Sequence, residues 1–82
     1  MTDRERSFTV LLALFDLARL GLPCNRARIA GRVGLSEPHV AAALARLARA
    51  SFVRRGRLSL TGLALATSLD RARASVHTLL AA

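Results

Sequence analysis

Residues 29–47 read IAGRVGLSEPHVAAALARL, which is two short apolar patterns of helical spacing separated by Gly34. Glycine adopts a left-handed backbone conformation at little cost, so Gly34 is expected to end one helix. Leu35 is expected to fill the corner that follows, and Ser36 begins the next pattern. The stretch therefore predicts a helix over residues 26–33, a tight turn, and a second helix that continues to about residue 50.

Capping residues support the two helix starts. Asn25 and Ser36 are residue types that accept hydrogen bonds from the backbone amides of a first helical turn. Glu37 places a negative charge at the positive end of the helix dipole, and Pro38 is tolerated in the first turn. The side chains expected to turn inward from the second helix are Val40, Leu44, Leu47 and Ser51.

A hairpin and a long helix are predicted after residue 50. Residues 52–54 and 57–60 have the composition of short strands, with Arg55-Gly56 as the turn between them. A two-residue turn would set Arg54 directly opposite Arg57, and opposed like charges destabilise a sheet unless an anion lies between them. Thr61 is expected to cap a last helix from Gly62 to the end.

The first helix should run from about Asp3 or Ser7 to Leu20, before Gly21 and Pro23. It is apolar on two sides, and the last helix carries a short heptad-like seam, so both are expected to need a second copy of the chain. Pairing of these two helices within one chain is the alternative. The predicted homodimer contacts are Val10, Leu14, Leu17, Leu65, Leu69, Val76, Leu79 and Leu80.

Positive charge is concentrated in the middle of the chain. The 82 residues carry a formal net charge of +8, and eight of the thirteen arginines lie between residues 25 and 57, with Glu37 as the sole acid there. Such clustering favours nucleic acid as the partner. A membrane-surface helix would instead place its arginines and its apolar residues on opposite faces of one helix.

The sequence argues against several other classes. A single Cys24 forms no intrachain disulfide, and with His39 and His77 it gives too few ligands for a metal site. The longest apolar run, residues 10–15, is far too short to cross a bilayer. With no secretory signal, a cytoplasmic and nucleoid-associated location is expected. No catalytic constellation or phosphate-binding glycine loop is present, so neither an enzyme nor a cofactor is expected.

Several residues resemble the DNA-binding core of bacterial transcriptional regulators of the multiple-antibiotic-resistance type. These are Ile29-Ala30, Gly34, Val40, Leu47 and Phe52-Val53, with Ser51 where that family has a glycine. The resemblance implies a mainly α fold with a small β-hairpin, the winged helix-turn-helix. Residues 1–82 would form one domain, with the helix-turn-helix at about 26–50, the wing at about 52–60 and the last helix at about 62–81. The short wing and the absence of effector-pocket helices depart from the family.

In this fold the second helix of the motif enters the major groove. The predicted base contacts are Ser36, His39, Ala42 and Arg46. The predicted phosphate contacts are Arg26, Arg28, Arg32, Arg49, Arg54, Arg55 and Arg57.

A homodimeric transcriptional regulator that binds double-stranded DNA is the leading interpretation. Two alternatives stay open: an architectural protein that coats DNA with little sequence preference, and a winged-helix module that binds an unknown protein. Cys24 precedes a helix and lies near arginines, which can lower a thiol pKa in a redox sensor. Its simpler interpretation is a small buried residue in a loop.

Overall fold

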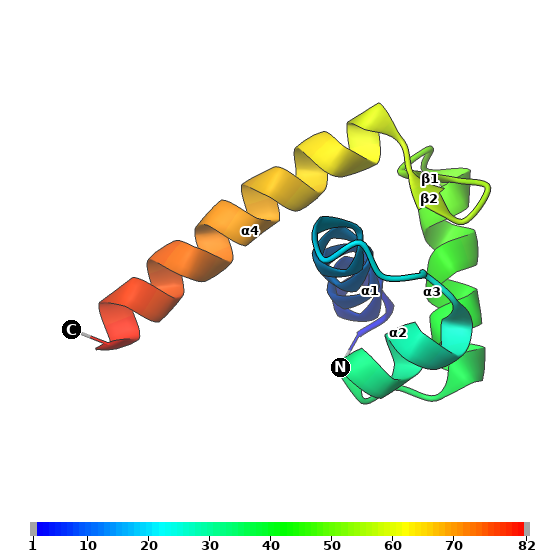
Figure 1. Ribbon diagram of the computed structural model, residues 1–82, viewed down its shortest axis with the longest axis horizontal. Coiled ribbons are helices and arrows are strands. Elements are labelled where there is room, and N and C mark those ends of the chain that lie inside the picture. Colours follow the sequence, from blue (N-terminus) through cyan, green and yellow to red (C-terminus); the bar gives the residue numbers. More distant parts are fainter. Residues whose placement is uncertain (1, 82) are drawn as a thin grey trace.

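Four helices and one two-stranded hairpin make up the fold (Figure 1). The computed structural model describes residues 2–81, without the side chains of His77 and Ala81. The elements are α1 (Asp3–Arg19), α2 (Arg26–Val33), α3 (Glu37–Arg49), β1 (Val53–Arg54), β2 (Arg57–Leu58) and α4 (Leu60–Ala81). The predicted mainly α class with a small hairpin is thereby confirmed.

Side-chain caps fix the starts of the first three helices. Thr2 Oγ1 accepts from the Glu5 amide at 3.2 Å, while the Thr2 amide donates to the Glu5 carboxylate at 3.3 Å, which forms a capping box. Asn25 Oδ1 accepts from the Arg28 amide at 2.8 Å and begins α2, as predicted. Gly34 ends that helix with a φ of 72°.

The end of α3 differs from the sequence-based expectation. Ser51 is exposed and has a φ of 65°, so the prediction that it turns inward is wrong. The helical repeat no longer applies there because α3 ends at Arg49. Ala43, which is fully buried, lies inside the core instead. Ser51 adopts the left-handed conformation that a glycine would adopt more cheaply.

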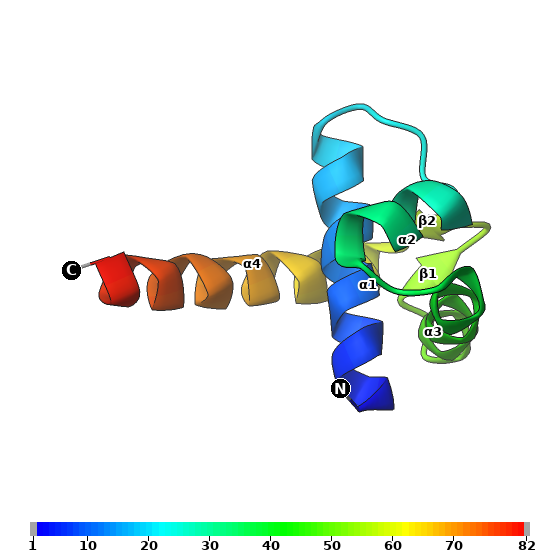
Figure 2. The same ribbon diagram turned by 90° about the horizontal axis from the view of Figure 1, so that it is seen from below.

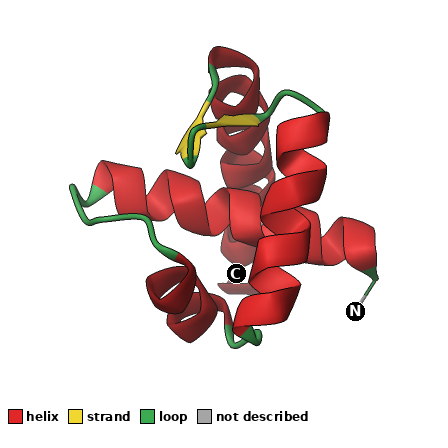
Figure 3. Ribbon diagram, turned by 90° about the vertical axis from the view of Figure 1, so that its right-hand side faces the viewer, coloured by secondary structure: helices red, strands yellow, loops and turns green. Residues whose placement is uncertain are grey.

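The two strands of the hairpin are drawn in yellow in Figure 3. They have the predicted register, because Val53 pairs with Leu58 and Arg54 with Arg57. Arg55 and Gly56 have φ values of 54° and 75°, and positive φ at both positions is typical of a type I′ turn.

The last helix begins two residues earlier than predicted. Ser59 is its cap, because the Ser59 Oγ accepts from the Gly62 amide at 3.0 Å and the Ser59 carbonyl accepts from the Leu63 amide at 2.8 Å. The prediction that Thr61 caps this helix is therefore wrong. Gly62 lies against the connection between α3 and β1, where a Cβ atom would fall 1.9 Å from the Phe52 carbonyl oxygen.

Helix α1 is the centre of the core and contacts all three other helices and β2 (Figure 2). Val10, Leu14 and Leu17 are each at most 2% exposed within one chain. A second copy cannot reach these three side chains, so the prediction that they form a dimer interface is wrong. The physical reason is that α2, α3, the hairpin and α4 surround α1 and already cover its apolar faces.

Helix α4 crosses α1 and then projects away from the other elements (Figures 1 and 2). Leu65 and Leu69, in its first half, pack partly buried against the core. Val76, Leu79 and Leu80, in its second half, are 55%, 77% and 82% exposed. Their predicted contact with a second copy stays a prediction.

Candidate nucleic-acid interface

One face of α3 is free of contacts with the core and carries mostly small side chains. Exposed on this helix and its cap are Ser36, Glu37, Pro38, His39, Ala42, Ala45, Ala48 and Arg49. Of these, Pro38, Ala42, Ala45 and Arg49 are spaced to form one stripe along the helix. A helix with such short side chains can approach a flat or grooved partner closely, but it offers few hydrogen-bond donors.

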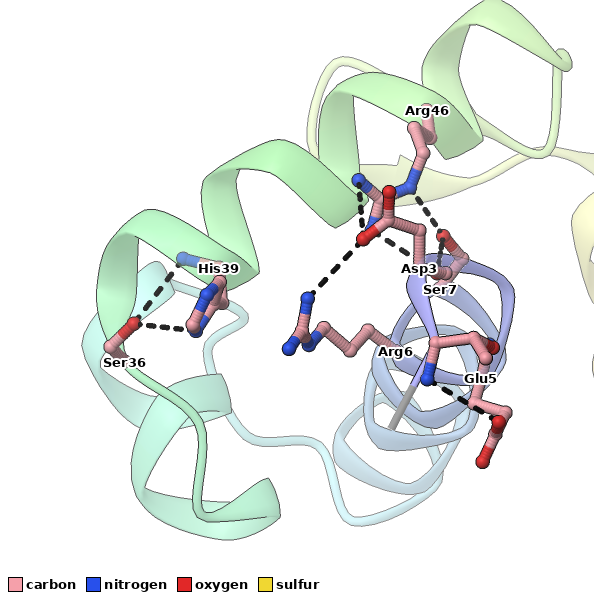
Figure 4. Close-up of polar contacts among 8 residues, drawn as sticks. Asp3, Glu5, Arg6, Ser7, Ser36, His39 and Arg46 are labelled. Atoms are coloured by element: carbon pink, nitrogen blue, oxygen red, sulfur yellow. Dashed lines mark hydrogen bonds and ion pairs between the residues drawn. The ribbon is translucent and has the colours of Figure 1, made fainter.

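His39 and Ser36 form a local unit at the start of α3 (Figure 4). The Ser36 Oγ accepts from the His39 amide at 3.5 Å and lies 3.0 Å from the His39 Nδ1 atom. The imidazole is exposed and held at the N-terminal end of the helix. In a helix inserted in a major groove, this is the end that lies nearest the bases.

Arg46 has a different environment from the one that the sequence suggested (Figure 4). Its Nε atom donates to the Ser7 Oγ at 2.9 Å, and its Nη2 atom donates to the Asp3 carbonyl oxygen at 3.1 Å. Its Nη1 atom lies 4.0 Å from the Asp3 carboxylate, and the side chain is 27% exposed. Arg46 thus ties α3 to the first turn of α1, and a base contact would require these bonds to break.

The hairpin presents three exposed arginines, Arg54, Arg55 and Arg57, which line a shallow hollow by themselves. Arg54 and Arg57 face one another across the two strands. No carboxylate of the described residues lies within 4.0 Å of any of the three. Like charges opposed in this way cost about 0.2–1 kcal/mol in the absence of an anion.

Helix α2 divides its arginines between two environments. Arg26 and Arg28 are exposed, with no carboxylate of the described chain within ion-pair distance. Arg32 instead has its Nη2 atom 3.5 Å from an Asp16 carboxylate oxygen on α1. Its predicted phosphate contact would compete with this intramolecular pair.

A charged network joins α1, α2 and α4 around Asp16. Arg73 on α4 donates to both carboxylate oxygens of Asp16, at 3.0 and 3.2 Å, and to Asp70 at 2.5 Å. Arg19 lies 3.6 Å from the other oxygen of Asp70. Burial raises the pKa of Asp16, but the hydrogen bonds and charges of Arg73 and Arg32 outweigh it, so the pKa lies below its ordinary value of 3.8.

This network and the Arg46 contacts are not apparent from the sequence. Asp70 and Arg73 have the three-residue spacing of a helical ion pair, which is a local signal. Asp16 and Ser7, by contrast, are 57 and 39 residues from their arginine partners, so only the fold brings them together.

Most of the acidic side chains therefore form ion pairs or helix caps away from the hairpin. Asp3, Asp16 and Asp70 pair with arginines, and Glu5 completes a helix cap. Two of the exposed arginines without an ionic partner among the described residues, Arg4 and Arg71, lie on α1 and α4. The other six lie on α2, at the end of α3 and in the hairpin: Arg26, Arg28, Arg49, Arg54, Arg55 and Arg57. This set, called the arginine surface below, is a basic surface that suits a polyanion.

Neither a metal-ligand cluster nor a membrane-spanning helix is found in the part of the chain that the structure describes. No three of its His, Cys, Asp or Glu side chains come together as they would around a metal ion. None of its helices has the length and apolar character needed to cross a bilayer.

Comparisons with known proteins give no independent assignment. No family model, curated protein or solved structure matches this chain.

Proposed function

We propose that this chain is a winged helix-turn-helix transcriptional regulator that binds double-stranded DNA as a homodimer. Helix α3 would lie in the major groove, and the hairpin would act as a wing on the phosphate backbone. The observation that carries the proposal is the arginine surface, above all the hairpin, where Arg54 and Arg57 oppose one another with no described carboxylate nearby. A phosphate between them would turn a repulsion into an attraction.

Phosphate contacts should supply most of the affinity. Six exposed arginines of the arginine surface can contact phosphates, whereas His39 and Arg49 are the only long donors on the free face of α3. Contacts to phosphates position a protein on DNA but carry no sequence information directly. We therefore expect affinity to fall steeply with salt.

Low sequence preference is favoured by the surface of α3, so an architectural role is the second candidate. The exposed alanines have no side-chain hydrogen-bonding groups, although they can touch thymine methyl groups. Arg46, the residue best suited to read guanine, is engaged by Ser7 and Asp3. These observations limit the number of bases that one copy can distinguish.

The homodimer rests on the projecting half of α4. Val76, Leu79 and Leu80 are exposed on a helix that extends beyond the core, and their spacing continues that of Leu65 and Leu69. A two-fold pairing of α4 with its copy would cover this apolar surface and place two α3 helices for successive major grooves.

Fluorescence anisotropy with a labelled random duplex and a labelled pool-selected duplex, each over a salt series, tests the proposal. A steep negative slope and a preference of at least about a hundredfold for the selected DNA would support a sequence-specific regulator. A steep slope without preference would favour the architectural role. Absence of binding at low salt would reject both and leave a protein-binding module.

The wing is tested by replacing Arg54, Arg55 and Arg57 with alanine. Each lost phosphate contact should make the slope of log K against log salt shallower by about 0.9. Arg71→Ala is the matched control, because Arg71 is an exposed arginine on α4 and does not belong to the arginine surface. An unchanged slope in the triple variant would reject a wing on phosphates.

A further inference from the structure

A large hollow lies between the α1–α2 connection, the hairpin turn and the start of α4. Its volume is about 730 Å³, which is within the roughly 300–1,000 Å³ of small-molecule sites. Most of its lining is apolar and comes from Leu14, Ala18, Leu22, Pro23, Leu58, Leu60 and Leu63. The Cys24 side chain, half-buried, also belongs to the lining.

Three leucine side chains at this hollow are exposed to solvent. Leu22, Leu60 and Leu63 are 40%, 88% and 43% exposed, and they lie far from the apolar end of α4. Burying such a side chain contributes about 1.5–3 kcal/mol. An apolar chain laid along the hollow would recover part of this free energy.

The charge of the lining is positive. Arg55 and Arg57 both border the hollow, and no acid does. The polar group of Ser59 is already used, since its hydroxyl donates to the Ser51 carbonyl at 2.6 Å and accepts from the Gly62 amide. The available polar partners are therefore cationic, and they favour an anionic group on the ligand.

We propose that this hollow binds a free single-chain amphiphile with an anionic head group, such as a medium-chain fatty acid. The chain would lie on the exposed leucines, and the carboxylate would approach the hairpin turn. Arg55 and Arg57 are also wing residues in the proposed function, and a bound carboxylate would compete with a DNA phosphate for them. This competition rests on the proposed function; the binding of the amphiphile does not.

Calorimetric titration with decanoate tests the binding directly. Decyltrimethylammonium has the same chain with a cationic head, and it should bind at least about tenfold more weakly, a difference of 1.4 kcal/mol. Cys24 gives a second measurement, because bound decanoate should slow its alkylation by a thiol reagent.

Two variants locate the site. Leu60→Gln and Leu63→Gln alter side chains that are already exposed, so the fold should be retained, and each should weaken decanoate binding by about tenfold. Leu20→Gln is the matched control, since Leu20 is 60% exposed but does not line the hollow. Equal binding of the two amphiphiles, or unchanged binding in both hollow variants, would overturn the proposal. So would binding to anionic-lipid vesicles without binding of free decanoate.

The competition between decanoate and DNA is measured separately, by fluorescence anisotropy with labelled DNA. Decanoate should release DNA from the wild-type protein, while Leu63→Gln should bind DNA normally and resist release. If decanoate binds as expected but DNA never binds, the amphiphile site stands, and the proposed function and the competition fail. If DNA binds and decanoate does not, the amphiphile site alone fails.

Discussion

Gly62 lies in the first turn of α4, and its Cα faces the carbonyl group of Phe52, in the connection between α3 and β1. A Cβ atom there would meet that backbone oxygen at 1.9 Å, and no side-chain rotation can relieve the clash. Gly62→Ala should therefore lower the free energy of unfolding by about 1–3 kcal/mol or more, measured by urea denaturation. Gly31→Ala is the control, because nothing lies within 4 Å of its Cβ position and alanine favours a helix interior, so this change should stabilise the protein.

Arg46 and Arg49 are neighbouring arginines on α3 with different expected roles. Arg46→Ala removes hydrogen bonds to Ser7 and Asp3 and should lower the free energy of unfolding by about 1–2 kcal/mol. Arg49 is exposed and has no ionic partner among the described residues, so Arg49→Ala should change stability by less than about 0.5 kcal/mol. In DNA binding we expect the Arg49 variant to be the weaker of the two. A reversed order in both measurements would contradict these roles.

At the level of single residues, the sequence predicts the features that depend only on interactions between residues close together in the chain. The caps at Asn25 and Ser36 and the turn at Gly34 were predicted because each depends on neighbours within three or four positions. The contacts of Arg46 and Gly62 depend on segments that meet only after folding. Ser51 differs from the expectation for a local reason, because α3 ends before it. Gly62 stands out as a glycine at the start of a helix, but its contact with Phe52 could not be inferred from spacing.

Among the elements, the hairpin carries a repulsion that its proposed ligand would relieve. Arg57→Ala removes one of two opposed guanidinium groups and should raise the free energy of unfolding by about 0.2–1 kcal/mol. The same variant should bind DNA more weakly. Thermal unfolding and anisotropy measured on the same preparation check the pair of effects. Loss of stability together with loss of binding would show that Arg57 supports the fold and would remove this argument for an anion site.

The junction of α1, α2 and α4 should be sensitive to acid. The folded-state pKa of Asp16 lies below 3.8, so the ion pairs stabilise the fold fully above this value and are lost as the pH falls through the folded-state pKa. Asp16→Asn should therefore be less stable than wild type at neutral pH, and the difference should shrink below about pH 3.8. Chemical denaturation across that range measures it. A difference that stays constant as the carboxylate is protonated would contradict this account.

The element order could be predicted because apolar periodicity, glycines and caps agree over residues 3–60. What covers the apolar faces of α1, by contrast, could not be predicted. Periodicity shows that a face must be covered, but it does not say whether the cover comes from the same chain or from another. The four elements packed around α1 leave its innermost leucines no external surface.

For the whole molecule, the projecting half of α4 leads to a prediction about assembly. Replacing Leu79 and Leu80 with glutamate should give a monomer by sedimentation analysis, because the charges would prevent burial of this apolar surface. Thr78→Glu is the control, since Thr78 lies on the same exposed segment but outside the apolar stripe. Helical content should be the same in both variants. A wild-type protein that is monomeric at micromolar concentration would contradict the homodimer.

The hydrogen bonds between Arg46 and the N-terminal part of α1 also have a practical consequence for protein engineering. Asp3 and Ser7 hold the side of α3, and Thr2 caps the helix that carries them. An affinity tag fused ahead of Thr2 would be tethered beside the proposed DNA-reading helix, and a bulky one would obstruct it. A cleavable tag joined by a flexible spacer keeps that side of the protein free for binding assays.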